Sequence, residues 1–303
     1  MQGTVDGFSY GLVTPVAAFL MACLGAALGL RCTARSVGTP PGGTGPIRTA
    51  GPDRTGRPYR AGWLALGSTS IGSGIWTMHF IAMMGFRIDE VPITYDRTLM
   101  YASLAVAIVM VGIGIFIVGY RGATPLALVT GGTITGLGVA SMHYLGMAAI
   151  AFHGRFAYST ATVVLSVVIA VVAATVALWA AVSLHGLLPS LGAGVVMGAA
   201  VSGMHYTGMA ALRVHLVSGA ADASGSEPIG SILVPLLVGP LAFLLLAGVI
   251  VLFDPLIVGG DPGPDDASRR TQTGTDRRGI PVQRRGDTAA EPAFDSAHRP
   301  RRP

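Results

Sequence analysis

Charged residues are scarce in this chain, and this scarcity sets its class. Asp, Glu, Lys and Arg together make up 12% of the 303 residues, whereas apolar residues make up 51%. An ordinary soluble domain carries about 25% charged residues. The composition therefore excludes an ordinary soluble domain and indicates a membrane protein.

Lysine is absent, so all twenty cationic side chains are arginines. Most of them lie in two polar segments outside the apolar stretches. This distribution is typical of topology signals and of charge at a membrane surface. It does not favour a binding groove for a duplex, and we expect no nucleic-acid partner.

Cysteine is nearly absent, with only Cys23 and Cys32 in the chain. Nine helical residues separate two Cα atoms by about 13 Å, and a disulfide needs about 7 Å or less. Neither cysteine belongs to a CxxC pattern. Disulfide, redox and thiolate-metal chemistry therefore have little support.

Long apolar stretches, by contrast, are abundant. Seven of them reach the roughly 20 residues that a helix needs to cross a bilayer. They lie near 7–30, 62–85, 98–119, 124–151, 160–184, 187–212 and 230–253. The sequence therefore predicts an all-α polytopic membrane protein with seven transmembrane helices, and Asp6, where a signal peptide has basic residues, argues against a cleavable one.

Arginine positions predict how these helices are oriented. Sixteen of the twenty arginines fall in the 31–61 loop, at Arg121 and in the tail after the seventh helix. The positive-inside rule then places the N-terminus outside and the C-terminus in the cytoplasm. We expect a membrane domain over 1–253, with a flexible cytoplasmic loop at 31–61. A disordered Arg/Pro-rich cytoplasmic tail is expected over 254–303.

One short pattern, Met-His-aromatic-x-small-Met, occurs three times inside the apolar stretches. The copies are Met78–Met83, Met142–Met147 and Met204–Met209, and their histidines are 64 and 62 positions apart. A near-constant period indicates an internal repeat. We therefore expect three repeated two-helix units about a pseudo-threefold axis, plus a seventh helix without the motif.

The motifs end the second, fourth and sixth helices, so their histidines should meet at one depth, in the outer leaflet. Imidazole and the soft thioether together select copper, and Cu(I) above Cu(II). The predicted ligands are His79, His143 and His205, with Met83, Met147 and Met209 one turn further out. The small residues Ala82, Gly146 and Gly208 are interpreted as points of close helix packing. The aromatic residues Phe80, Tyr144 and Tyr206 are interpreted as pocket wall or interface belt.

These motifs resemble the MHYT family of bacterial integral membrane sensors, named for the sequence that stands here at Met204–Thr207. The resemblance covers about residues 8–253 and departs at Phe80-Ile81 and Tyr144-Leu145 without changing the ligand types. It implies a copper site near the outer face that senses oxygen, carbon monoxide or nitric oxide. The ligand set it implies also includes Met78, Met142 and Met204.

The expected function is that of a non-enzymatic sensor in the bacterial plasma (inner) membrane. A diatomic gas ligand would shift the bundle between two packings. Family members are fused to cyclic di-GMP domains, which the tail does not resemble. The change would therefore pass to an unknown cytoplasmic signalling partner in trans.

Two other functions stay open at this point. A metal-dependent membrane hydrolase would use three histidines on zinc and an activated water, with a general base among Asp89, Glu90 and Asp96. A transporter of copper or a small solute would need polar residues along a full path. The inner halves of the motif-bearing helices offer only Ser and Thr, which ranks the transporter lowest.

Overall fold

The computed structural model describes residues 5–6, 10–37, 56–88, 91, 93–184, 187–216 and 229–253. Within these residues the chain forms seven helices. The helices are α1 (Val13–Val37), α2 (Gly56–Met84), α3 (Arg97–Arg121), α4 (Pro125–Ala148), α5 (Thr160–Ser183), α6 (Leu187–Ala210) and α7 (Ile229–Leu252). By length and composition, α1, α3, α4, α5 and α7 can each cross a membrane. The prediction of an all-α polytopic membrane protein is confirmed.

The predicted loop at 31–61 is wrong at both of its ends, because α1 continues to Val37 and α2 begins at Gly56. Arginine is a good helix former, and two arginines near these helix ends pack on aromatic rings of the neighbouring helices. The Arg35 guanidinium lies 5.5 Å from the centre of the Trp63 ring, and Arg60 lies 5.0 Å from that of Tyr120. Residues 38–55 and the predicted tail at 254–303 lie outside the described residues.

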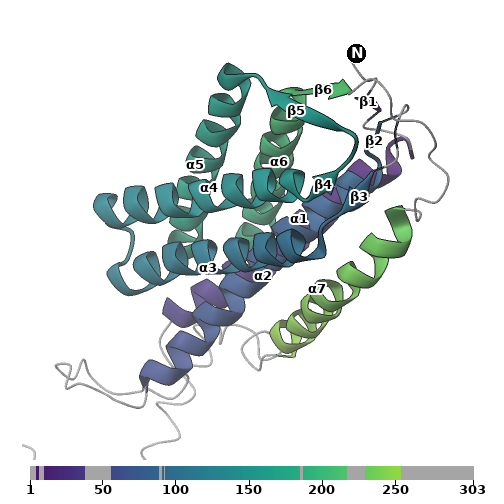
Figure 1. The fold of residues 1–303 in the computed structure, drawn as a ribbon. Helices are drawn as coiled ribbons and strands as arrows, with labels where there is room; N and C mark the ends of the chain where they lie inside the picture. Colours follow the sequence, from purple (N-terminus) through teal and green to yellow (C-terminus); the bar gives the residue numbers. More distant parts are fainter. Residues whose placement is uncertain are drawn as a thin grey trace, which may run out of the picture. The chain divides into compact units, whose positions relative to one another are not determined.

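Three short antiparallel strand pairs, which the sequence analysis did not predict, lie at one end of the bundle (Figure 1). They are β1 (Val5–Asp6) with β2 (Arg87–Ile88), β3 (Thr94–Tyr95) with β4 (Ile150–Ala151), and β5 (Gly154–Tyr158) with β6 (Leu212–Leu216). Each pair joins the segment before an odd-numbered helix to the segment after the next even-numbered one. The pairs therefore tie α1 to α2, α3 to α4 and α5 to α6. We call this the strand end of the bundle.

Helices α1 to α6 form a closed ring, because each packs against the next and α6 packs against α1. Helix α7 stands outside this ring and packs against α2 and α1. As a result α2 is enclosed by its ring neighbours α1 and α3 and by α7, and all residues from Ile71 to Phe80 are buried. The first motif lies at the end of this enclosed stretch.

A glycine seven residues before each motif histidine sets the spacing of the ring. A Cβ added at Gly72 would lie 2.8 Å from the Cα of Ile108 in α3. One added at Gly136 would collide with the Val171 backbone in α5, and one at Gly198 would lie 2.5 Å from the Cys23 sulfur in α1. Each even-numbered helix therefore approaches another helix through an equivalent glycine. Helix α2 meets α3, α4 meets α5, and α6 meets α1 rather than α7.

This contact gives a stability prediction. Gly136→Ala should lower the free energy of unfolding by about 1–3 kcal/mol, because a rigid backbone cannot give way to the added methyl group. The matched control is Gly203→Ala in α6, where an added Cβ meets nothing within 4 Å. The control should be neutral or slightly stabilising, since alanine favours a helix over glycine. Thermal unfolding in detergent measures both, and equal midpoints for the two variants would contradict the close approach of α4 and α5.

Candidate metal centre

The structure brings His79, His143 and His205 together from α2, α4 and α6. Their Nδ1 atoms form a nearly equilateral triangle with separations of 3.1, 3.2 and 3.3 Å. The three side chains are only 1%, 1% and 2% exposed. They form a group of buried potential metal ligands among the described residues.

The three rings stand almost perpendicular to one another around the triangle. Ring centres are 5.0–5.1 Å apart, with interplanar angles of 81°, 84° and 88°. The centre of such a triangle lies about 1.8–1.9 Å from each Nδ1 atom, close to the 2.0–2.1 Å of a metal–imidazole bond. A slight widening, or an ion just off the plane, meets that distance. The three nitrogens therefore fit one metal ion.

Without a cation the triangle cannot satisfy its own hydrogen-bonding groups. Each Nδ1 atom carries either one proton or one lone pair in the ring plane. Whichever tautomers the three rings adopt, at least one of the three Nδ1–Nδ1 contacts brings two protons or two lone pairs together. A buried polar group left unsatisfied costs about 1–3 kcal/mol. A positive ion at the centre would accept three lone pairs at once, which is a physical reason for this arrangement to hold a cation.

Small residues of the neighbouring motif hold two of the rings in place. A Cβ added at Gly146 would lie 2.5 Å from His79 Nε2, and one added at Gly208 would collide with His143 Nε2. The interpretation of these glycines as helix contacts therefore needs a correction, because the surface they meet is the next histidine. Neither Nε2 atom has a hydrogen-bond partner within the described residues. The glycines leave each ring room to point Nδ1 at the common centre.

Each histidine also packs against the aromatic residue that follows it. The ring centres of His79 and Phe80, His143 and Tyr144, and His205 and Tyr206 are 4.7, 4.8 and 5.0 Å apart. All three pairs meet edge to face, with angles of 71–79°. The aromatic residues thus form the wall of the site, as the sequence analysis interpreted them.

Two serines of the odd-numbered helices brace the motifs, and the sequence analysis did not assign them a role. Trp76 donates from Nε1 to the Ser103 hydroxyl at 3.0 Å, and its ring lies 4.6 Å from Phe80. Tyr144 and Ser166 share a 2.7 Å hydrogen bond, in which the tyrosine donates because Ser166 donates to the Val163 carbonyl. The two serines are 63 positions apart, which matches the spacing of the motif histidines. The repeat period was therefore the signal that could have identified them as equivalent residues.

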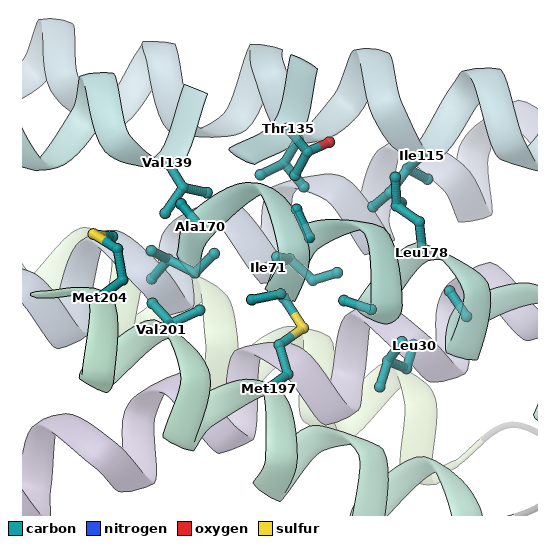
Figure 2. Close-up of a pocket in the computed structure, with 16 residues that line it drawn as sticks. Leu30, Ile71, Ile115, Thr135, Val139, Ala170, Leu178, Met197, Val201 and Met204 are labelled. Atoms are coloured by element: carbon teal, nitrogen blue, oxygen red, sulfur yellow. The ribbon is translucent and has the colours of Figure 1, made fainter. Parts of the chain in front are cut away.

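The six predicted methionine ligands are placed differently. Five are buried, namely Met78, Met83, Met142, Met147 and Met204, whereas Met209 is only partly buried. Met204, which directly precedes His205 in the sequence, lines a cavity on the bundle axis (Figure 2). The polar contacts recorded for the three imidazoles join them to one another. The role of the methionines as ligands stays a prediction.

The predicted carboxylates of the strand end do not reach the histidines as far as the structure describes them. Asp96 is the N-cap of α3 and accepts hydrogen bonds from the backbone N–H groups of Thr98 and Leu99 at 2.8 and 3.2 Å. Asp89 and Glu90 lie outside the described residues. The described part of the site is therefore made of neutral donors.

Comparison with known proteins identifies the repeat. Residues 72–131, 136–194 and 198–257 each match MHYT, the bacterial signalling protein N terminal repeat. Each matched segment begins in a motif-bearing helix and continues into the helix that follows it. No solved structure matches the chain.

Three curated relatives are signalling proteins. The chain is 36% identical over 197 residues to the bifunctional diguanylate cyclase/cyclic di-GMP phosphodiesterase MucR of Pseudomonas aeruginosa, covering 63% of this chain and 29% of that protein. It is 34% identical over 160 residues to the signaling protein YkoW of Bacillus subtilis, covering 50% and 20%. It is 34% identical over 167 residues to the cyclic di-GMP phosphodiesterase NbdA of P. aeruginosa, covering 52% and 21%.

The chain thus spans less than a third of the length of these relatives. The part that it shares with MucR and NbdA is the membrane repeat. The similarity therefore indicates a signalling role and does not extend to the catalytic activities of these two enzymes. Three matched repeats cover more than half of the chain. The protein therefore belongs to the MHYT family of bacterial membrane signalling proteins.

Proposed function

We propose that this protein is a copper-binding sensor of the bacterial plasma membrane, with one ion held by His79, His143 and His205 near the outer face. The observation that supports it is the convergence of three buried, neutral nitrogen donors at one point. Imidazole suits copper, zinc, iron and nickel alike. The choice among these metals therefore depends on the surroundings of the triangle.

The surroundings favour a monovalent ion. The described side chains that meet the triangle are neutral, so the charge of a bound ion is not compensated there. The cost of moving an ion from water into a medium of low dielectric constant rises with the square of its charge. Cu(I) would carry a single charge, whereas Zn²⁺ and Cu²⁺ would carry two. The buried methionines of the three motifs would add soft thioether donors, which also select Cu(I).

Sensing follows from what such a site can do with a small ligand. When bound, copper supplies a position at which oxygen, carbon monoxide or nitric oxide can bind. The chain's own residues then turn a shift of the imidazoles into a change of helix packing. Gly146 and Gly208 pass the shift between neighbouring motifs, and Trp76 passes it to α3 through Ser103.

The output passes to a cytoplasmic signalling partner in trans. Two of the relatives carry cyclic di-GMP synthesis or hydrolysis in their names. We therefore propose that the partner acts in cyclic di-GMP turnover. The hydrolase alternative has no comparable support among the described residues, because Asp96, the one predicted general base described there, caps α3. The transporter alternative also lacks support, because the axial cavity beside the triangle is lined by apolar side chains, with Thr135 the one exception.

The copper site is tested by removing two of its ligands. The double substitution His143→Ala and His205→Ala should abolish bound copper while the protein remains inserted in the membrane. The matched control is His153→Ala with His215→Ala, because these histidines lie in the strand end. Elemental analysis of protein purified in mild detergent measures copper and zinc together. Full copper occupancy in the first double variant would overturn the site, and stoichiometric zinc in the unchanged protein would favour the hydrolase.

The packing of the rings gives a finer test. Gly146→Ala should weaken Cu(I) binding at least tenfold, or about 1.4 kcal/mol, because the new methyl group pushes His79 away from the centre. Gly203→Ala is the control, since it adds the same group two residues from His205 without a contact. Competition with a chromophoric Cu(I) chelator gives both affinities. Unchanged affinity in Gly146→Ala would show that the ring position does not govern binding.

The orientation is tested with single cysteines in a Cys23→Ala, Cys32→Ala background. His153 is exposed at the strand end and Ala123 is exposed between α3 and α4, at the opposite end. A membrane-impermeant maleimide added to intact spheroplasts should label His153→Cys and spare Ala123→Cys. The reverse pattern would place the three histidines near the cytoplasmic face.

A further inference from the structure

A small cavity lies on the bundle axis, one helical turn from the triangle of histidines. Ile75, Val139 and Val201 line it, and each stands four residues before a motif histidine, on the same helical face. The cavity has a volume of about 30 Å³. A water molecule needs about 10–15 Å³ by this measure, so the space suits a molecule of about two heavy atoms.

The walls of this cavity select an apolar occupant. Thr135 is the single polar residue among the sixteen that line it, and its hydroxyl has no hydrogen-bond partner within the described residues. A water molecule needs two to four polar partners to occupy a buried site. Apolar cavities stay dry and take up apolar atoms or molecules instead.

A second hollow opens on the surface of the bundle, between α5 and α6. This groove has a volume of about 540 Å³ and is lined by apolar side chains of the two helices. Val172, Val176 and Val196 in its lining are 50–62% exposed. In a bilayer such a surface faces acyl chains, where apolar molecules concentrate relative to water.

The groove and the cavity share three lining residues, Ala173, Ala177 and Met197. The wall between them is therefore one side chain thick along this seam. Two of the three residues are alanines, whose small side chains form only a thin wall between the groove and the cavity. The third, Met197, points into the cavity in Figure 2, and its unbranched side chain can change rotamer easily.

Access from water at the strand end is poorer. The three histidines are at most 2% exposed, and one turn beyond them Met83 and Met147 are 1% exposed while Met209 is partly buried. A ligand from the aqueous phase would have to displace this packed layer. From the lipid side it would have to displace only the Met197 side chain.

We propose that the α5–α6 seam is a lateral passage through which a small apolar gas molecule moves from the acyl chains into the axial cavity beside the three histidines. Its destination at a metal rests on the proposed function. The passage and the cavity rest only on the shared wall. Gas would thus reach the site at the concentration it has in the membrane rather than in water.

Xenon tests the passage without any metal. In the full-length protein in lipid nanodiscs, xenon-129 exchange NMR should detect a bound population. Ala177→Phe should abolish that population, since it fills the shared wall, and Met197→Ala should speed exchange several-fold. Leu165→Phe is the matched control, because Leu165 is a lipid-facing residue of α5 that lines neither hollow. Thermal unfolding checks that each variant is folded.

The outcomes separate the two proposals. Xenon binding that is absent, or exchange that is unchanged in both wall variants, overturns the passage. Xenon binding that responds as expected in a protein that takes up no copper supports the passage and removes the metal site. In copper-loaded protein, association of carbon monoxide should slow at least tenfold in Ala177→Phe at unchanged copper content. An unchanged association rate would show that gas reaches the histidines by another path and would overturn the proposal.

Discussion

Three imidazole nitrogens that face one point cannot satisfy one another, and this constraint organises the bundle. The Nδ1 atoms of His79, His143 and His205 are 3.1–3.3 Å apart in a setting closed to water. Folding therefore leaves at least one unsatisfied polar group, at a cost of about 1–3 kcal/mol, at the centre of an apolar core. A cation at that point would relieve the conflict, and its binding would then be coupled to the packing of α2, α4 and α6.

The ring of helices achieves this convergence through equivalent small residues. Gly72, Gly136 and Gly198 let each motif-bearing helix approach its neighbour at backbone distance, and Gly146 and Gly208 make room for the rings. The family repeat runs from a motif-bearing helix to the helix after it, which would put α7 beside α6. In space α1 closes the ring, while α7 covers α2. The pseudo-threefold symmetry is thus completed by a helix from outside the matched repeats.

The sequence allowed the helices and the meeting of the histidines to be predicted, because both follow from periods in the chain. Apolar stretches of about 20 residues predict spans, and a histidine period of 64 and 62 predicts one depth. The pairs β1–β2 and β3–β4 were missed because strands of two residues leave no alternating pattern. The strands β5 and β6 have five residues each, and Leu212–Leu216 does alternate apolar and polar residues, so a signal for this pair was present. The contacts of Gly146 and Gly208 with imidazole were missed because a small residue does not show what it meets. The axial cavity depends on side chains of all six ring helices, and no local pattern encodes such a space.

The central claim is that three imidazoles, and no other set of side chains, form the core of the site. X-ray absorption at the copper edge of the protein in lipid measures the number and kind of ligand atoms directly. The account predicts a shell of three nitrogens at about 2.0 Å with the outer-shell scattering of imidazole rings. Sulfur at longer distance would add the methionines to this shell. A shell with fewer than two imidazoles, or one made of sulfur alone, would contradict the account.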